Sequence, residues 1–80
     1  MRTTGTAVQF QALASALPGL GSGFAWYSTK SGNVKSVAMA TGLGQVLFDI
    51  SDTFALADFT AFMVGAGLTG RLAEVDSITS

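Results

Sequence analysis

SDTFALADFTAFMVGAGLTG, residues 51–70, is the most apolar stretch of the chain and has the features of a helix. Its first three residues carry side-chain oxygens that accept hydrogen bonds from the free N–H groups at a helix start. Near its end, Gly65 and Gly67 favour termination, because glycine readily adopts the left-handed conformation that closes many helices. We therefore predict the main helix at about 52–64, extending to 69 if these glycines are accommodated inside it.

Small side chains recur at every fourth position of this predicted helix and therefore form one stripe along it. They are Thr53, Ala57, Ala61, Gly65 and Thr69. A stripe of this kind lets a second backbone approach closely. We expect it to be a packing interface with a neighbouring helix, in this chain or in another one. The alternative is an ordinary buried helix of a small domain.

Asp58 is the one charge in the interior of the stretch. If packing buries this carboxylate, it needs a basic partner. The chain offers four candidates, which are Arg2, Lys30, Lys35 and Arg71. Residues 53–70 are also near the lower length limit for a membrane span. An aspartate at the bilayer centre costs about 2.5–3.5 kcal/mol on insertion scales, which counts against such a span.

The end of the stretch, Gly65-Ala66-Gly67-Leu68-Thr69-Gly70, fits the pattern G-x-G-x-x-G, and residues 59–64 before it can be read as a strand. Over about residues 58–74 the chain thus resembles the dinucleotide-binding fingerprint of Rossmann domains, whose glycines let the backbone approach a pyrophosphate. That fingerprint also requires an acidic residue about 20 positions later. The sequence stops ten residues after Gly70, so we expect no βαβ unit and no bound cofactor.

The composition leaves the chain with little polar surface. Only 11% of its 80 residues are charged, against about 25% in an average soluble domain, and 49% are hydrophobic. The length suffices for one domain, and a domain of this size is marginally stable alone. Since no cysteine is present to form a disulfide, stability is most simply gained by association with other subunits.

The residue content also argues against several functions. The chain has no histidine and no cysteine, which removes the commonest metal ligands and the commonest general base. Asp49 and Asp52 are an acidic pair, but capping of a helix start explains Asp52 without chemistry. A net charge of −1 provides no basic patch for phosphates. We expect no catalysis, no metal, no small-molecule substrate and no nucleic-acid partner.

The N-terminal half carries signals for a short helix and a β-hairpin. Residues 6–17 combine strand-like alternation with an Ala- and Leu-rich end, and a helix fits this run slightly better. Two β-forming runs around the turn Ser31-Gly32-Asn33 predict a hairpin at about 24–40. Trp26 and Tyr27 lie in the first of these runs. They can be interpreted as interface anchors, as residues at a membrane boundary, or as ordinary core residues. Residues 45–50 form a short strand or lead into the main helix.

These features predict one α+β domain over residues 1–80. Its parts are an N-terminal segment and Gly-rich connector at 1–23, a β-hairpin region at 24–50, the main helix at 51–70 and a polar, extended tail at 71–80. The alternation in residues 72–78 also allows this tail to be an edge strand, whose charges oppose aggregation. The alternative is an all-α membrane helical hairpin.

For function, we expect a structural subunit of a large multi-chain assembly, with a small capsid or virion-membrane protein as the concrete form. Its partners are then copies of itself and other assembly subunits, and its location is a virion or a membrane rather than the free cytosol. The lack of cysteine argues against disulfide-dependent secretion. One alternative is a small integral membrane subunit that spans the lipid bilayer at about 53–70. Another is a soluble binding module with the hairpin as its recognition face.

Overall fold

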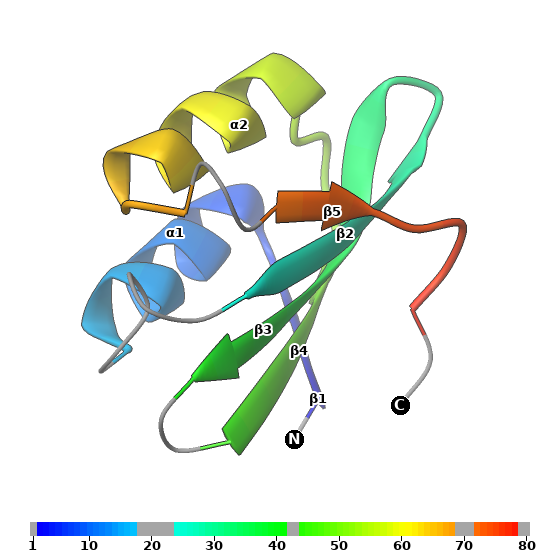
Figure 1. Ribbon diagram of the computed structural model, residues 1–80. Coiled ribbons are helices and arrows are strands. Elements are labelled where there is room, and N and C mark those ends of the chain that lie inside the picture. Colours follow the sequence, from blue (N-terminus) through cyan, green and yellow to red (C-terminus); the bar gives the residue numbers. More distant parts are fainter. Residues whose placement is uncertain (1, 18–23, 42–43, 69–71, 79–80) are drawn as a thin grey trace.

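The computed structural model describes residues 2–17, 24–41, 44–68 and 72–78. Two helices and a mixed five-stranded sheet make up this part of the chain (Figure 1). Their bounds are β1 Arg2–Gly5, α1 Ala7–Ala16, β2 Ala25–Lys30, β3 Asn33–Thr41, β4 Gly44–Ile50, α2 Leu56–Gly65 and β5 Leu72–Glu74. The α+β class is confirmed, and the all-α alternative is wrong because strands form the centre of the fold. In the described ranges, no helix has the length and apolar character needed to cross a membrane.

The sheet has the strand order β1-β4-β3-β2-β5. Strands β2, β3 and β4 follow one another as an antiparallel meander, which includes the hairpin predicted at about 24–40. Each edge is a short strand that runs parallel to its neighbour, β1 beside β4 and β5 beside β2. Sequence reasoning assigned no strand to residues 2–5. It placed residues 72–74 in a polar tail or an edge strand, and the structure shows the edge strand. The predicted connector at 18–23 lies outside the described residues.

The hairpin between β2 and β3 closes with a two-residue turn, because Lys30 pairs directly with Asn33. The turn residues Ser31 and Gly32 both have positive φ angles, 57° and 82°. This conformation matches the right-handed twist of the flanking strands. The three-residue turn predicted from the sequence is therefore one residue too long. Asn33 is the first residue of β3 instead.

A β-bulge corrects the alternation of β3. Ser28 pairs with Ser36, whereas the next residue of β2, Thr29, pairs with Val34, so Lys35 is an extra residue on β3. Val34 and Val37 are both fully buried in the core, although they lie three positions apart. Without the extra residue, strict alternation would place them on opposite faces.

Helix α1 begins with a capping box. The Thr6 side chain accepts a hydrogen bond from the Gln9 N–H, and the Gln9 side chain accepts one from the Thr6 N–H. The carboxylate of Asp52 accepts a further bond, 2.8 Å long, from the N–H of Ala7. Asp52 therefore stabilises the start of α1, not the start of the main helix as the sequence suggested.

Helix α2 begins at Leu56, four residues later than predicted. The residues before it remain extended because their backbone bonds to the hairpin. Val34 donates from its N–H to the carbonyl of Phe54, and Leu56 donates to the carbonyl of Gly32. These long-range bonds outweigh the local capping signals at 51–53, and Ala55, the N-cap, makes no side-chain capping bond.

A Schellman motif ends α2 at Gly65. The N–H of Leu68 donates to the carbonyl of Met63, and the N–H of Gly67 donates to that of Val64. Gly67 has φ of 85°, the left-handed conformation expected at this position. Residues 59–64 are thus helical, and the first two glycines of the G-x-G-x-x-G pattern belong to a helix end. The strand-then-helix context of a dinucleotide fingerprint is absent over 59–68.

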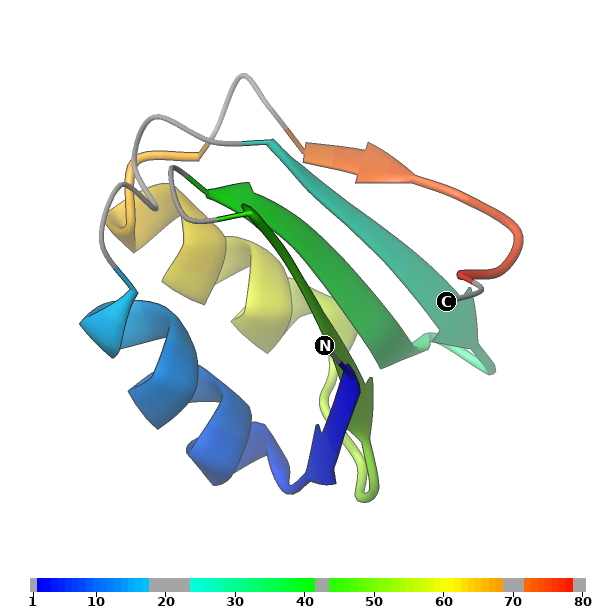
Figure 2. The same ribbon diagram turned by 90° about the horizontal axis from the view of Figure 1, so that it is seen from below.

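Phe10 is the centre of the hydrophobic core, which lies between the helices and one face of the sheet. Its ring centroid lies 5.5–6.1 Å from those of four other phenylalanines. These are Phe48 on β4, Phe54 before α2, and Phe59 and Phe62 on α2. Both helices cover the same face of the sheet (Figure 2), so neither covers the opposite face.

Candidate functional site

The sheet face turned away from the helices is the candidate site, and we call it the open face. Alternation along β2 defines it: Ala25 is fully buried in the core, so its neighbours Phe24 and Trp26 point to the other side. Cross-strand partners share a face, so the register extends this assignment across the sheet. The open face consists of Phe24, Trp26 and Ser28; Ser36, Ala38 and Ala40; Gln45, Leu47 and Asp49; Arg2 and Thr4; and Ala73.

An aromatic pair forms the raised part of the open face. The rings of Phe24 and Trp26 are stacked, with centroids 6.1 Å apart and an interplanar angle of 28°. Phe24 is 55% exposed, although it is a large apolar residue. Beside the pair on β3 lie two alanines: the N–H of Ala40 donates to the carbonyl of Phe24, and Ala38 pairs with Trp26. The two aromatic rings form a ridge, and the two alanines form a floor beside it. Ala40 is half-buried, whereas Ala38 is only 3% exposed, so Ala40 is the accessible part of this floor.

A continuous row of paired residues crosses all five strands on this face. It runs from Arg2 through Leu47, Ala38 and Trp26 to Ala73. Three members of the row are alanine or leucine, and Trp26 adds the largest ring in the chain. The middle of the open face is therefore apolar, which is unusual for a sheet side that neither helix covers. Ala38 and Leu47 are only 3% and 6% exposed within this chain, so Phe24 and the half-buried Trp26 supply most of its accessible apolar surface.

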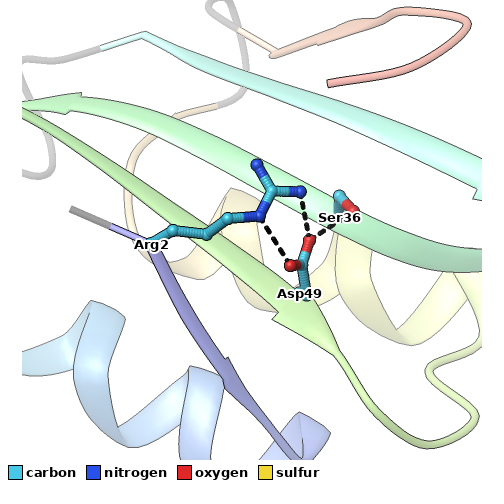
Figure 3. A network of polar contacts seen from close by, with 3 residues as sticks. All are labelled: Arg2, Ser36 and Asp49. Carbon is cyan, nitrogen blue, oxygen red and sulfur yellow. Dashed lines mark hydrogen bonds and ion pairs between the residues drawn. The ribbon is translucent and has the colours of Figure 1, made fainter. Parts of the chain in front are cut away.

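The charges on the open face neutralise each other near β1. Arg2 donates two hydrogen bonds to the carboxylate of Asp49: Nε to Oδ2 at 2.7 Å, and the terminal Nη2 to Oδ1 at 2.8 Å. The hydroxyl of Ser36 donates to the same Oδ1 at 2.9 Å (Figure 3). The hydrogen bond from Arg2 is the main reason why the pKa of Asp49 lies below its ordinary value; burial opposes this shift, and the Ser36 hydroxyl adds to it.

Trp26 and Tyr27, predicted together as anchors or core residues, have separate roles. They are adjacent on β2 and so point to opposite faces of the sheet. The Tyr27 ring lies 5.0 Å from that of Phe59 and packs against the core. Trp26 belongs to the open face. The sequence signal that distinguishes them is the alternation Phe24-Ala25-Trp26, in which the small residue is the buried one.

The predicted small-residue stripe lies on the outside of the fold. Ala57, Ala61 and Gly65 are exposed on α2, and no atom lies within 4 Å of where a Cβ of Gly65 would be. Thr53 is exposed and precedes the helix, and Thr69 lies outside the described residues. The stripe therefore packs against no neighbour within the described chain, and its proposed contact with another chain stays a prediction.

Asp58 is exposed in the first turn of α2. The hypothesis of a buried charge is therefore wrong for this chain taken alone. A carboxylate at this position interacts favourably with the positive end of the helix dipole, which explains Asp58 without a basic partner.

The acidic residues do not form a shared site. Asp49 is bound by Arg2 and Ser36, and Asp52 accepts from the backbone of Ala7. Among the residues with described positions, no group of three His, Cys, Asp or Glu side chains is arranged to hold a metal ion. Comparison with protein families, with curated proteins and with solved structures finds no match to this chain. The functional argument therefore rests on the geometry of the open face.

Proposed function

We propose that this chain is a non-catalytic structural subunit of a multi-chain assembly, and that the open face is the surface through which it contacts other chains. The observation that carries the proposal is the stacked pair of Phe24 and Trp26 on a sheet face that neither helix covers. The proposal applies to an assembly of any kind, including the virion shell expected from the sequence.

Apolar area and neutral charge support a protein partner. Aromatic side chains are enriched at the centres of protein interfaces, and tryptophan is prominent among the residues that dominate binding energy. The Arg2 and Asp49 charges are already paired with each other, so a partner that covers this face need not supply a compensating charge. A phosphate backbone, in contrast, is bound by unpaired basic side chains.

The size of the native complex tests this proposal. The endogenous chain is released by gentle lysis and separated by gel filtration at physiological salt. It should elute at an apparent mass far larger than that of the 8.2 kDa monomer. The same chain carrying Phe24→Ser should shift toward the monomer, whereas Val8→Ser should not. Val8 is the matched control because it is 73% exposed on α1, away from the open face. Elution of the endogenous wild-type chain as a monomer would refute the proposal.

A second candidate function uses the same face. The chain can act as a soluble binding module that presents Phe24 and Trp26 to one different protein, without forming a larger assembly. The same aromatic pair, of which Phe24 is 55% exposed, supports this alternative. The two functions differ in stoichiometry: a module forms a complex of defined and small size, whereas an assembly subunit occurs in many copies.

A further inference from the structure

We infer that the partner of the open face is a second copy of this chain, bound face to face about a two-fold axis that runs between β2 and β3, along the strands. This inference rests on the proposed function and names the partner for the same surface. In such a pair, the Phe24–Trp26 ridge of each copy lies over the Ala40 end of the other copy's floor, because Ala38 is only 3% exposed within its own chain.

The register of the sheet makes the open face complementary to itself. The ridge is on β2 and the floor is on the adjacent strand β3, with Phe24 opposite Ala40 and Trp26 opposite Ala38. A rotation by 180° about an axis between these strands exchanges their positions. The Phe24 ring of each copy then meets the Ala40 methyl group of the other, once in each direction, which is the reciprocity that a two-fold interface requires.

The charge distribution permits two identical faces to meet. In a symmetric pair each copy brings the same charges, so a face with a net charge repels itself. Here the Arg2 guanidinium and the Asp49 carboxylate form a two-bond ion pair within one copy. The rotation also moves this pair from β1 and β4 to the far side of the contact, near the rim. An apolar centre with a polar rim is the ordinary anatomy of a protein interface.

The available area is that of a weak, transient dimer. With the axis between β2 and β3, four strands of each copy face strands of the other, and β1 lies beyond the contact. Strands lie about 4.8 Å apart and rise about 3.3 Å per residue, so four strands of roughly six residues cover about 19 Å by 20 Å, or about 380 Å². A standard interface buries about 800 Å² per partner, so this contact is smaller than stable, specific interfaces and has the size of a weak, transient one. Its affinity then depends on a few anchors, which makes it sensitive to single substitutions at the aromatic pair.

Two complementary variants test the reciprocal contact. Phe24→Glu removes one anchor, and Ala40→Lys places a charge on the floor that faces it. Phe24 is largely exposed and Ala40 lies on the open face, so both changes leave the core intact, and circular dichroism verifies folding. Each variant alone should self-associate at least about tenfold more weakly than the wild type in sedimentation velocity.

An equimolar mixture of the two variants should recover heterodimers. The carboxylate introduced in one variant then meets the ammonium group introduced in the other, while the second ridge-to-floor contact keeps its native residues Phe24 and Ala40. Opposite charges brought together in this way attract. In a homodimer of either variant, by contrast, the introduced charge faces an apolar side chain in both symmetric contacts.

The outcomes separate this inference from the proposed function. A wild-type chain that stays monomeric up to about 1 mM, a concentration that reveals even millimolar dissociation constants, overturns the inference. So does self-association that neither variant weakens, and so does a mixture that associates no better than its components. If the purified chain is monomeric but the endogenous chain elutes in a large complex, the proposed function stands and a different protein covers the open face. If the purified chain dimerises and the endogenous chain is only a dimer, the inference stands and the larger assembly is refuted.

Discussion

Replacement of Phe10 should be the most damaging single change in the fold. Its side chain is fully buried, and its ring contacts four other phenylalanine rings. Truncation of a buried phenylalanine to alanine typically costs about 3–5 kcal/mol. A domain of this size has a total stability of about 4–12 kcal/mol. Phe10→Ala should therefore remove a large part of the stability. Phe10→Leu should remove less, so this variant stays folded and its loss of stability can be measured.

Phe10→Leu keeps most of the apolar volume but loses the ring contacts. Near-isosteric core replacements cost up to about 1.5 kcal/mol, and each lost aromatic pair adds about 0.5 kcal/mol or more. Since Phe10 forms four ring pairs, we expect a loss of about 2–3.5 kcal/mol. This loss lowers the melting temperature by roughly 8–28 °C for a domain of this length. Thermal unfolding followed by circular dichroism at one fixed protein concentration gives the value, since association would otherwise shift the midpoint.

Val8→Ala is the matched control for this experiment. Val8 is on the same helix as Phe10 but is 73% exposed, so its truncation should change stability by less than about 0.5 kcal/mol. Equal melting temperatures for Phe10→Leu and Val8→Ala would show that α1 does not pack on the sheet through Phe10. The description of the core would then be wrong.

Four further predictions concern single positions. Gly5→Ala should destabilise the chain by about 1–3 kcal/mol in urea unfolding, because the added methyl carbon would lie 2.9 Å from the ring of Phe48. Gly65→Ala, where the methyl group meets nothing within 4 Å, should instead be neutral or stabilising. If Gly65→Ala destabilised the chain more than Gly5→Ala, the packing described around β1 would be contradicted. Ser31→Asn should stabilise by about 0.5–1 kcal/mol, since asparagine tolerates the left-handed conformation better than serine; an unchanged urea midpoint would argue against this turn. Asp49→Asn should cost about 0.2–1 kcal/mol at neutral pH. The pKa of Asp49 is lowered in the folded state, so its stabilising effect is complete above the pKa of the unfolded state and is lost as pH falls through the folded-state pKa. The stabilities of the wild type and of Asp49→Asn should therefore become equal in acid. A difference in stability that persists below both pKa values would contradict this assignment.

The class of the fold and several of its signals could be predicted from the sequence. Hydrophobic patterning indicated strands and a turn near Ser31-Gly32, and the apolar stretch contained the helix that is now α2. The start of that helix could not be located locally. Its capping candidate Asp52 is used by α1, 45 residues away in sequence, and the backbone of 54–56 bonds to the hairpin. Strand β1 was missed because four residues with two threonines and a glycine have little pattern, and pairing with β4 makes them a strand.

Only part of the candidate site could be predicted from the sequence. Trp26 drew attention because it is a rare and large residue, but its separation from Tyr27 required knowledge of which face the helices cover. Arg2 and Asp49 are 47 positions apart, so no local spacing indicates their ion pair. The small-residue stripe was evident in the sequence, yet periodicity alone does not say whether a stripe faces inward, and here it faces outward.

Fluorescence of Trp26 tests the central claim most directly. It is the only tryptophan in the chain and lies on the open face, so its emission reports on that surface alone. In the purified chain at low concentration, acrylamide should quench Trp26 efficiently. In the native complex, or at concentrations where the purified chain associates, quenching should fall several-fold and the emission should shift to the blue. Equal quenching of Trp26 in the free chain and in an intact complex would show that other chains bind elsewhere and would contradict the assignment of the open face as the contact surface.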